Sequence, residues 1–571
     1  MDSPRVAYFS MEIALNASMP TYAGGLGVLA GDTVRSAADL GLPLTAVTLL
    51  HRHGYFAQRL DADGRQSESP VDWAPEDFCD ALEPRVAVEI AGREVWIRAW
   101  RYRVEGVCGG DPVLAYLLDT DLPENDPEDR RLTDSLYGGT ERTRLAQEMI
   151  LGIGGVRMLR ALGHLELDRL HLNEGHAALA ALALLEERAP APPSSAAAVE
   201  MHVAAVRERC VFTTHTPVPE GHDSFPRRLA RSMLGKRSWR WLAALGDGDH
   251  LNLTELALRV SRFVNGVAMR HAEVSRRMFP EHPIRAITNG IHAPTWAAPS
   301  FAALFDRHVP EWRRDAFSLR YVVGIPHAEI WAAHGAAKRA LLERARAESG
   351  RELDPEVLTL GFARRSTGYK RATLVFRNRE LLAALAARGG GLQLVFAGKA
   401  HPRDESGKAL IRDVFAAAEA LRGRVEVAYL ANHDMRLGRL LCAGVDVWLN
   451  NPVPPLEASG TSGMKAALNG VPSLSMLDGW WVEGCVEGVT GWAVDGGADA
   501  HLAPAARDDR HAAALYDKLG GSVMPCYYGN RQRFVEIMRH AVSLNAGFFN
   551  TQRMVLEYLY EAYLDPGPPC P

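Results

Sequence analysis

A lysine that follows a run of small residues is the stretch of this sequence best suited to covalent chemistry. The run 459–463 contains only Ser, Gly and Thr, so its backbone can approach a ligand closely. Residues 464–468 favour a helix that Asn469-Gly470 ends, and the N–H groups at the start of such a helix suit a phosphate. Lys465 is expected in the first turn, where the dipole disfavours the ammonium form and favours an amine able to form a Schiff base. The alternative is a glycine-rich turn with a solvated lysine.

A second group of candidate residues is cationic. The segment 364–371, Arg-Arg-Ser-Thr-Gly-Tyr-Lys-Arg, follows a strand predicted over 357–363 and is expected to turn into another helix. Arg suits bidentate contact with a phosphate, whereas Lys acts as a point charge. Taken alone, the four cations of this segment are more typical of a solvated face.

Polar residues also follow predicted strands in the first half of the chain. Asn173, Glu174 and His176 end one strand, and His215 lies where the next strand breaks into a proline-rich turn. Polar side chains at the carboxyl ends of sheet strands belong to the usual ligand crevice of an α/β protein. A capped helix start is the alternative for Glu174 and His176, and a hydrogen-bonded place in the core is the alternative for His215.

These residues need a frame that brings strand ends together. A strand over 5–10, a glycine loop with Gly24 and Gly25, a helix to residue 40 and a strand over 41–50 follow in order. This order is the one that a parallel α/β sheet with a phosphate-facing loop requires, although a tight structural turn would also contain such glycines. The second half repeats the rhythm, and residues 541–563 show one long helical pattern. A chain of 571 residues is too long for a single core, so at least two domains are expected.

Composition excludes several classes of protein. Hydrophobic residues make up 47% and charged residues 23%, as in ordinary soluble globular proteins. With 64 basic and 69 acidic residues the net charge is −5, so neither nucleic acid nor an anionic membrane is an expected partner. The seven cysteines are scattered without a C-x-x-C pair, which is typical of thiols in a reducing compartment and not of a zinc site. No segment approaches the length of a membrane span and the start lacks a secretory pattern, so we expect a cytoplasmic protein without a metal.

Six motifs together resemble one enzyme family over nearly the whole chain. The segment 457–470, EASGTSGMKAALNG, followed by LDGWWVE at 477–483, resembles the pyridoxal-phosphate segment of the α-glucan (glycogen/maltodextrin) phosphorylases. The other motifs occur in that family's order. They are the glycine loop, Asn-acid-x-His at 173–176, Thr-His-Thr at 214–216, Thr-Asn-Gly at 288–290 and Arg…Tyr-Lys-Arg at 365–371.

The resemblance implies a fold and a reaction. The fold is α/β, with two Rossmann-like domains facing each other across a cleft in the GT-B glycosyltransferase arrangement. A glucan- and phosphate-side domain is expected over 1–290, a domain that binds pyridoxal phosphate over 291–545, and a helix and tail over 546–571 that cross back to the first domain. The reaction is reversible phosphorolysis of glycogen or maltodextrin from the non-reducing end, giving α-D-glucose 1-phosphate with retention. A homodimer is a further expectation from the family.

The resemblance also implies roles for individual residues. Pyridoxal 5′-phosphate would be anchored on Lys465, and its phosphate would exchange a proton with the substrate phosphate. The residues expected to be catalytic are Lys465, Arg365, Lys370 and His215. Those expected to bind the cofactor are Lys465, Thr461, Ser462, Arg364 and Lys370. Those expected to bind the sugar, the glucan chain or the substrate phosphate are Gly24, Gly25, Glu174, His176, His215, Asn289, Glu457, Ser459 and Gly460. A helix cap is the alternative role of Glu457.

Some features depart from the animal enzymes of that family. Ser462-Gly463 stands in place of Gly-Asn, Thr367-Gly368 in place of His-Glu, and Ala23 in place of Asn, so affinity and acceptor preference stay open. The chain begins almost at the first predicted strand, so we expect a short bacterial-type form with little regulation.

Two other functions suit the same fold. A nucleotide-sugar glucosyltransferase would need a donor nucleotide site in place of a cofactor on Lys465, and a silent glucan-binding relative would have lost a phosphate or cofactor ligand.

Overall fold

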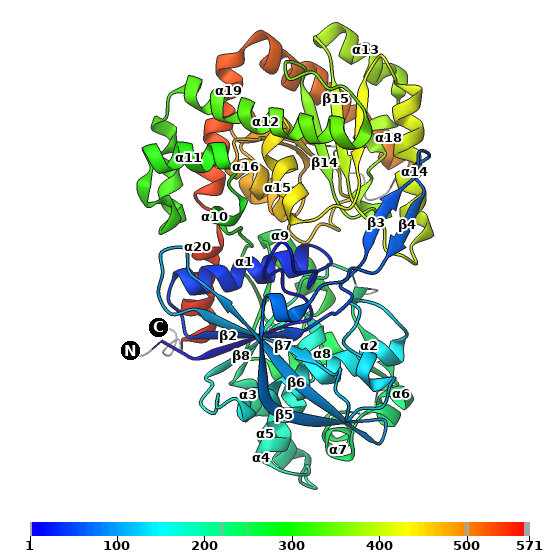
Figure 1. The fold of residues 1–571 in the computed structure, drawn as a ribbon, viewed down its shortest axis with the longest axis vertical. Helices are drawn as coiled ribbons and strands as arrows, with labels where there is room; N and C mark the ends of the chain where they lie inside the picture. Colours follow the sequence, from blue (N-terminus) through cyan, green and yellow to red (C-terminus); the bar gives the residue numbers. More distant parts are fainter. Residues whose placement is uncertain (1–2, 219–220, 247, 496, 498–501, 565–571) are drawn as a thin grey trace. The chain divides into compact units, whose positions relative to one another are not determined.

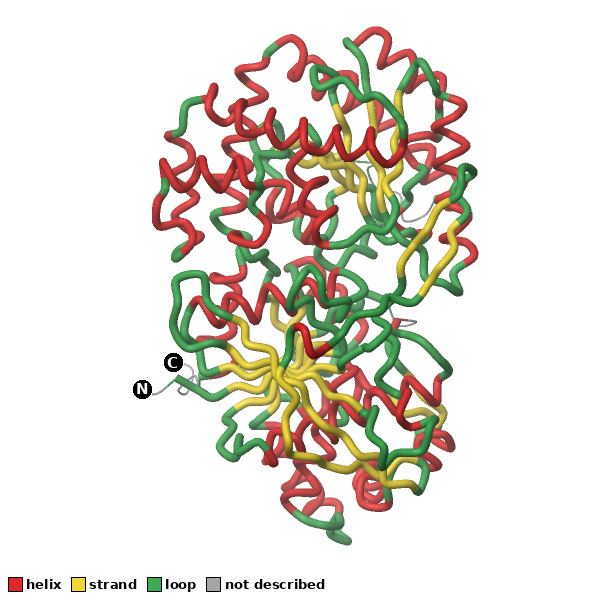
Figure 2. Tube along the Cα trace, in the orientation of Figure 1, coloured by secondary structure: helices red, strands yellow, loops and turns green. Residues whose placement is uncertain are grey.

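The computed structural model describes residues 3–218, 221–246, 248–495, 497 and 502–564 (Figure 1 and Figure 2). The chain divides into two units. The described parts of Met1–Phe56, Pro70–Thr288 and Met554–Pro571 form the first unit, and those of Ala57–Ser69 and Asn289–Arg553 form the second. Residues 565–571 of the expected tail lie outside the described residues.

The first unit is built on one large sheet. Among the described residues it has nine strands in the order β13-β12-β9-β8-β1-β2-β7-β6-β5. Neighbours from β13 to β7 are parallel, whereas β6 pairs antiparallel with β7 and β5. The bounds are β1 (Val6–Ser10), β2 (Leu44–Leu49), β5 (Asp80–Ile90), β6 (Arg93–Val104), β7 (Val113–Asp119), β8 (Arg169–Asn173), β9 (Cys210–Thr213), β12 (Phe263–Gly266) and β13 (Ile284–Ala286). Because β1 lies between β2 and β8, chain order reverses beside β1, which makes this the switch point of the sheet.

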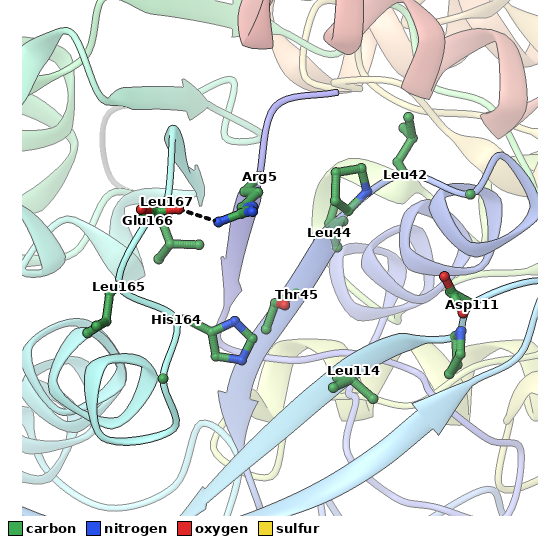
Figure 3. Close-up of a pocket in the computed structure, with 14 residues that line it drawn as sticks. Arg5, Leu42, Leu44, Thr45, Asp111, Leu114, His164, Leu165, Glu166 and Leu167 are labelled. Atoms are coloured by element: carbon green, nitrogen blue, oxygen red, sulfur yellow. Dashed lines mark hydrogen bonds and ion pairs between the residues drawn. The ribbon is translucent and has the colours of Figure 1, made fainter. Parts of the chain in front are cut away.

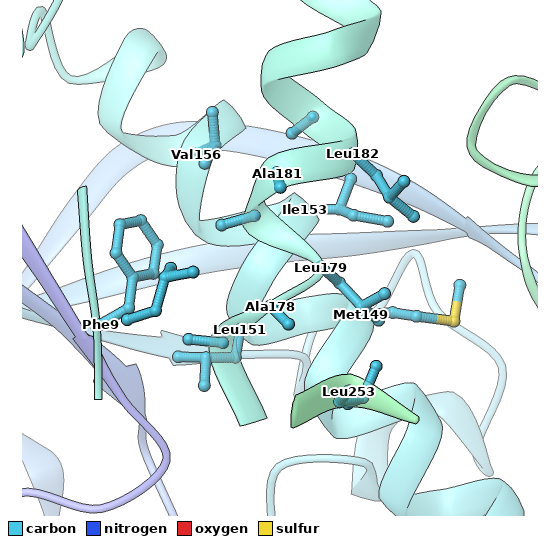
Figure 4. Close-up of a cluster of buried hydrophobic side chains, with 14 of the residues drawn as sticks. Phe9, Met149, Leu151, Ile153, Val156, Ala178, Leu179, Ala181, Leu182 and Leu253 are labelled. Carbon is cyan, nitrogen blue, oxygen red and sulfur yellow. The ribbon is translucent and has the colours of Figure 1, made fainter. Parts of the chain in front are cut away.

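Helices cover this sheet, and their buried side chains pack against it to form the hydrophobic core. One continuous helical run consists of α2 (Glu141–Met149), the π-helical η3 (Ile150–Gly154) and α3 (Gly155–Ala161). Figure 4 shows Phe9 of β1 together with side chains of this run and of α4, all within one buried hydrophobic cluster. The other helices are α1 (Gly25–Asp39), η4 (Gly175–Ala177), α4 (Ala180–Arg188), α5 (Ala196–Arg207), α6 (Arg227–Met233), α7 (Lys236–Leu245), α8 (Leu253–Val260) and α9 (Met269–Met278). A small antiparallel sheet pairs β10 (Ser224–Pro226) with β11 (His250–Asn252).

The C-terminal segment belongs to the first unit from Met554 onward. Met554, Val555, Tyr558 and Tyr563 are buried with Val6 and Tyr8 in a second hydrophobic cluster. The prediction of one helix over 541–563 is wrong, because residues 547–550 separate η12 (Ala541–Ala546) from α20 (Thr551–Tyr558), which η13 (Leu559–Tyr563) continues. Asn550 causes the break. Its side chain accepts a hydrogen bond from the amide of Arg553 at 2.9 Å, and its backbone pairs with Ile291.

The second unit contains a fully parallel sheet. Among the described residues its six strands have the order β16-β15-β14-β17-β18-β19. Their bounds are β14 (Thr359–Ala363), β15 (Gln393–Ala397), β16 (Glu426–Leu430), β17 (Val447–Asn450), β18 (Ser473–Met476) and β19 (Gly491–Val494). The chain moves outward from β14 to β16, then returns to continue from β17 on the other side. The switch point therefore lies between β14 and β17, as in a Rossmann sheet.

Figure 2 shows the helices of the second unit around these strands. They are α10 (Ala293–Trp296), α11 (Pro299–His308), α12 (His327–Ser349), α13 (Arg379–Gly389), α14 (Glu405–Ala420), α15 (Met435–Gly444), α16 (Thr461–Leu468), α17 (Trp481–Gly484), α18 (Pro504–Lys518) and α19 (Arg531–His540). The hairpin of β3 (Ala57–Leu60) and β4 (Gln66–Ser69) belongs to this unit, since Gln58 donates to the carbonyl of Gly398 at 2.9 Å. None of the described helices is long and apolar enough to cross a membrane. The cysteines of the described part of the chain are free thiols.

Candidate active site

The cationic segment of the second unit leaves the sheet at its switch point. It follows β14 and forms the 3₁₀ turn η8 (Gly368–Lys370). The helix expected after this segment is α13, and it begins only at Arg379, because Arg371 adopts a left-handed conformation with φ 51° that ends η8. Arg364 and Lys370 are directed inward, whereas Arg365 is exposed. The expected contact of Arg365 with a phosphate stays a prediction.

Glu457 joins the two inward cations. One carboxylate oxygen lies 3.0 Å from the Arg364 guanidinium and the other lies 2.5 Å from Lys370 Nζ, with all three side chains largely buried. Burial opposes ionisation of Glu457, but Arg364 and Lys370 outweigh it and lower the pKa of Glu457 to about 2. Burial, together with the charge of Arg364, lowers the pKa of Lys370 to about 7. When Lys370 is protonated this cluster holds two cations against one carboxylate, which suits an anionic ligand.

Lys465 lies in the last turn of α16, so the prediction of a place in the first turn is wrong. The helix begins at Thr461, and its dipole favours the charged amine at Lys465 instead of opposing it. The residue is only 7% exposed, and its Nζ lies 3.8 Å from the centre of the Trp296 ring. Asn469 donates to the carbonyls of Lys465 and Trp296 at 2.9 and 3.0 Å, so the lysine and the ring are held together. The structure therefore confines the amine by packing.

The start of α16 is open to a ligand. Gly460 precedes the helix with φ 92°, no side chain caps the helix, and its first turn contains no acidic residue. Thr461 and Ser462 are the first two helical residues, and Ser462 accepts a hydrogen bond from the Trp448 indole at 3.3 Å. A bound anion would satisfy the amides at this uncapped end.

Two buried polar atoms of the second unit are available to a polar ligand. Within the described part of the chain, Ser459 Oγ and Asn289 Oδ1 have no hydrogen-bond partner, although both residues are buried. Buried polar atoms are nearly always paired, so each of these two atoms can form a hydrogen bond with a water or with a ligand. Gly479 fixes the place of Ser459, because a Cβ at Gly479 would lie 2.4 Å from the Ser459 carbonyl oxygen.

In the first unit, Glu174 connects two strand ends. One carboxylate oxygen accepts from the Gly175 amide at 3.0 Å, and the other accepts from the His215 amide at 2.8 Å and from the Thr216 hydroxyl at 3.0 Å. The structure therefore gives Glu174 the role of a cap and clamp at the ends of β8 and β9. Its expected contact with a glucan stays a prediction.

The two candidate histidines of the first unit have different partners. His215 Nε2 lies 2.7 Å from Asn173 Oδ1, and burial together with nearby histidines lowers the pKa of His215 to about 3. His176 is 9% exposed, and its Nε2 lies 3.1 Å from Asp223. His176 Nδ1 has no hydrogen-bond partner among the described residues. His215 is thus neutral at pH 7, and His176 has a ring nitrogen available for a ligand.

The glycine loop follows β1 at the switch point of the first unit's sheet. Gly25 begins α1, and a Cβ there would meet nothing within 4 Å, so a ligand can approach its backbone. The amides of Ala23 and Gly24 donate to the carboxylate of Glu12 at 2.5 and 3.2 Å. Sequence reasoning missed Glu12, although it follows β1 as Asn173 ends β8, and the same rule about strand ends would have found it.

One described cavity lies away from these residues. It has a volume of about 560 Å³ and is lined by Arg5, Leu44, Leu114 and Leu167, among others (Figure 3). These residues precede or begin strands β1, β2, β7 and β8. The cavity is therefore at the amino ends of the strands, away from the polar residues at their carboxyl ends. No cluster that could hold a metal ion occurs among the described residues.

A mixed sheet and a parallel sheet with polar residues at their switch points, together with a buried lysine in α16 and a buried cluster of two cations and a carboxylate, characterise an α/β protein. The Phosphorylase family model, described as carbohydrate phosphorylase, matches residues 236–491. The maltodextrin phosphorylase of Thermococcus litoralis is 40% identical over 600 residues, which cover 98% of this chain and 70% of that protein. The glycogen phosphorylase of Mycobacterium tuberculosis is 40% identical with the same coverage, and that of Aquifex aeolicus is 34% identical over 98% of this chain and 86% of its own. The chain belongs to the carbohydrate phosphorylase family.

Proposed function

We propose that this protein is an α-glucan phosphorylase. It transfers the terminal glucosyl unit at the non-reducing end of an α-1,4-glucan to inorganic phosphate, and it releases α-D-glucose 1-phosphate with retention. Relatives named maltodextrin phosphorylase and glycogen phosphorylase support this activity over nearly the whole chain. The structural observation that carries the proposal is the buried Arg364–Glu457–Lys370 cluster, because Glu457 lies just before the helix that contains Lys465.

The residues around α16 fit pyridoxal 5′-phosphate. Lys465 is a buried amine against an aromatic ring, and the uncapped start of α16 offers amides to a phosphate. Lys465, Thr461, Ser462, Arg364 and Lys370 would hold the group. When bound, it supplies a phosphate that exchanges a proton with the substrate phosphate near neutral pH.

Cations and backbone amides of this chain would stabilise the attacking phosphate. Lys370 contributes a charge that a bound anion favours, since an anion nearby raises the pKa of an amine. Arg365 is exposed next to Arg364 and can reach a phosphate with its planar guanidinium. The Gly25 amide at the start of α1 is the proposed contact from the first unit.

Neutral polar groups would orient the glucosyl ring. Burial keeps His215 neutral, so one ring nitrogen can donate and the other can accept a hydrogen bond. In the second unit Asn289 and Ser459 have the unpaired atoms described above. Glu457 and Gly460 lie close to Ser459 in the sequence motif. His176 and Glu174 are proposed to lie nearer the glucan chain. We propose that the residue sets of the two units act on one glucosyl unit across a GT-B cleft, and a homodimer stays a prediction from the family.

A phosphorolysis assay tests the proposal. The protein, loaded with pyridoxal phosphate, is incubated with maltoheptaose or glycogen and inorganic phosphate, and glucose 1-phosphate is measured. Lys465→Ala should abolish its formation, whereas the matched control Lys236→Ala, at an exposed lysine of α7, should leave it unchanged. Glucosyl transfer from a nucleotide sugar without phosphorolysis would support the nucleotide-sugar enzyme instead. Glucan binding without either reaction would support the silent relative.

A further inference from the structure

Glu12 is a buried carboxylate at the switch point of the first unit. It is 1% exposed. One oxygen accepts from the amides of Ala23 and Gly24 at 2.5 and 3.2 Å, and the other accepts from the Tyr137 hydroxyl at 2.8 Å. Both oxygens are therefore occupied by donors from this chain.

The first turn of α1 is packed directly against this carboxylate. A Cβ at Gly27 would lie 2.6 Å from the Glu12 carboxylate and 2.7 Å from Tyr22 Cβ. Only glycine allows this approach, because real Cβ atoms do not come so close to an oxygen. At Gly25, two residues earlier, a Cβ would meet nothing within 4 Å. The loop is thus fixed on the side of Glu12 and open at Gly25.

The hydrogen bonds of Glu12 decide which amides remain for a ligand. The amides of Ala23 and Gly24 are used by Glu12, while α1 begins at Gly25 without a side-chain cap and without an acidic residue in its first turn. A helix start of this kind suits an anion, but the nearby carboxylate repels one. The contribution of Glu12 to phosphate binding must therefore be geometric.

We propose that Glu12 is a positioning residue that holds the glycine loop so that the Gly25 amide meets the substrate phosphate. The inference rests on the proposed function, in which Gly25 contacts that phosphate. Glu12 also has a separate link to the sugar side. The backbone carbonyl of Glu12 accepts a hydrogen bond from Ser10 Oγ at 2.8 Å, and Ser10 Oγ accepts one from Asn173 Nδ2. The side-chain oxygen of Asn173 contacts His215. This link uses the backbone of Glu12, so it persists when the side chain is removed.

The test separates the Michaelis constants of the two substrates. In Glu12→Ala the KM for inorganic phosphate, at saturating maltoheptaose, should rise about tenfold, the equivalent of one lost hydrogen bond. The KM for maltoheptaose, at saturating phosphate, should stay within about twofold. Gly27→Ala should shift the same constant in the same direction, because the new Cβ displaces the carboxylate. Glu12→Gln should restore the wild-type value, since its carbonyl oxygen can accept from the loop amides and its NH₂ can donate to Tyr137.

Two control variants show whether a general loss of packing explains the result. Asp129→Ala removes another buried carboxylate of the first unit, which accepts from Arg93 at 2.8 and 2.7 Å. Gly521→Ala adds a methyl group at an exposed helical glycine with nothing within 4 Å. Both should keep the wild-type KM for phosphate, whatever they do to thermal stability.

Three outcomes would overturn the proposal. Equal rises in both KM values, an unchanged KM for phosphate in Glu12→Ala, or a Glu12→Gln variant as impaired as Glu12→Ala would each exclude a geometric role in phosphate binding. If Glu12→Ala does not fold, Gly27→Ala and Glu12→Gln still give the comparison. A wild-type enzyme without phosphorolysis would instead reject the proposed function itself.

Discussion

Lys370 Nζ lies 2.5 Å from one carboxylate oxygen of Glu457, and the Arg364 guanidinium holds the other oxygen at 3.0 Å. Because both cations are buried, their charges depend on this one carboxylate. Glu457→Gln should lower the free energy of unfolding by about 3 kcal/mol or more, since it leaves buried cations without compensation. Urea denaturation measures this change. Glu329→Gln is the matched control, because its partners Arg307 and His308 are solvent-exposed or nearly so, and it should change stability little. Equal stability of the two variants would contradict the role of Glu457.

The binding of phosphate should depend on the protonation of Lys370. Its pKa is lowered from 10.5 to about 7, so the cation is present below pH 7 and is lost as the pH rises through that value. The KM for phosphate should therefore rise above pH 7 in the wild type. Lys370→Arg keeps its charge at every pH tested and should remove this part of the pH dependence, although its KM is higher throughout. Michaelis constants measured from pH 6 to 9 make the comparison. Parallel pH profiles for the two enzymes would show that Lys370 is not the titrating group.

His215 should act as a neutral hydrogen-bonding group. Burial lowers its pKa to about 3, so it gains no proton between pH 5 and 8. His215→Gln should lower kcat/KM about tenfold or more, because a sugar hydroxyl loses its partner, and it should leave the shape of the pH profile unchanged. A pH step near 6 that disappears in the variant would mean that His215 is charged during turnover.

Gly479 should be required for the position of Ser459. A methyl group at Gly479 would lie 2.4 Å from the Ser459 carbonyl oxygen, and φ is 55°. Gly488 has a similar φ of 67° but open space around it. Both Gly→Ala variants should lose about 1 kcal/mol of stability from the left-handed backbone, and Gly479→Ala should lose more because of its contact with the Ser459 carbonyl. Only Gly479→Ala should lose most of its phosphorolysis activity. Equal activity of the two variants would mean that the close contact at Ser459 does not matter.

The positions of the candidate residues in the sheets could be predicted because they depend on local pattern. Apolar runs that end in polar residues predict the strands β8, β9 and β14. Parallel strands bring such polar ends to one edge of the sheet. The boundaries of the helices are harder to predict from the sequence. The predicted position of Lys465 in the first turn is wrong because α16 begins at Thr461. Thr461 lies within a run of Gly, Ser and Thr, whose propensities favour a loop.

Other features depend on contacts between distant segments. The break before α20 depends on a bridge between Asn550 and Ile291, and the turn at Arg371 depends on bonds from its guanidinium to the carbonyls of Asn451 and Pro452. Glu12 and Ala23 are eleven residues apart in sequence, and only the folded loop shows that they are bonded. Propensity cannot show such contacts, because tertiary packing decides them.

The central claim is that Lys465 anchors pyridoxal phosphate in an α-glucan phosphorylase. The purified protein is treated with sodium borohydride, digested and mapped by mass spectrometry, with untreated protein as the control. The account predicts one pyridoxyl phosphate label, on Lys465, together with loss of the absorption band of the bound cofactor. Absence of any label after soaking with pyridoxal phosphate, or a label on a different lysine, would contradict it.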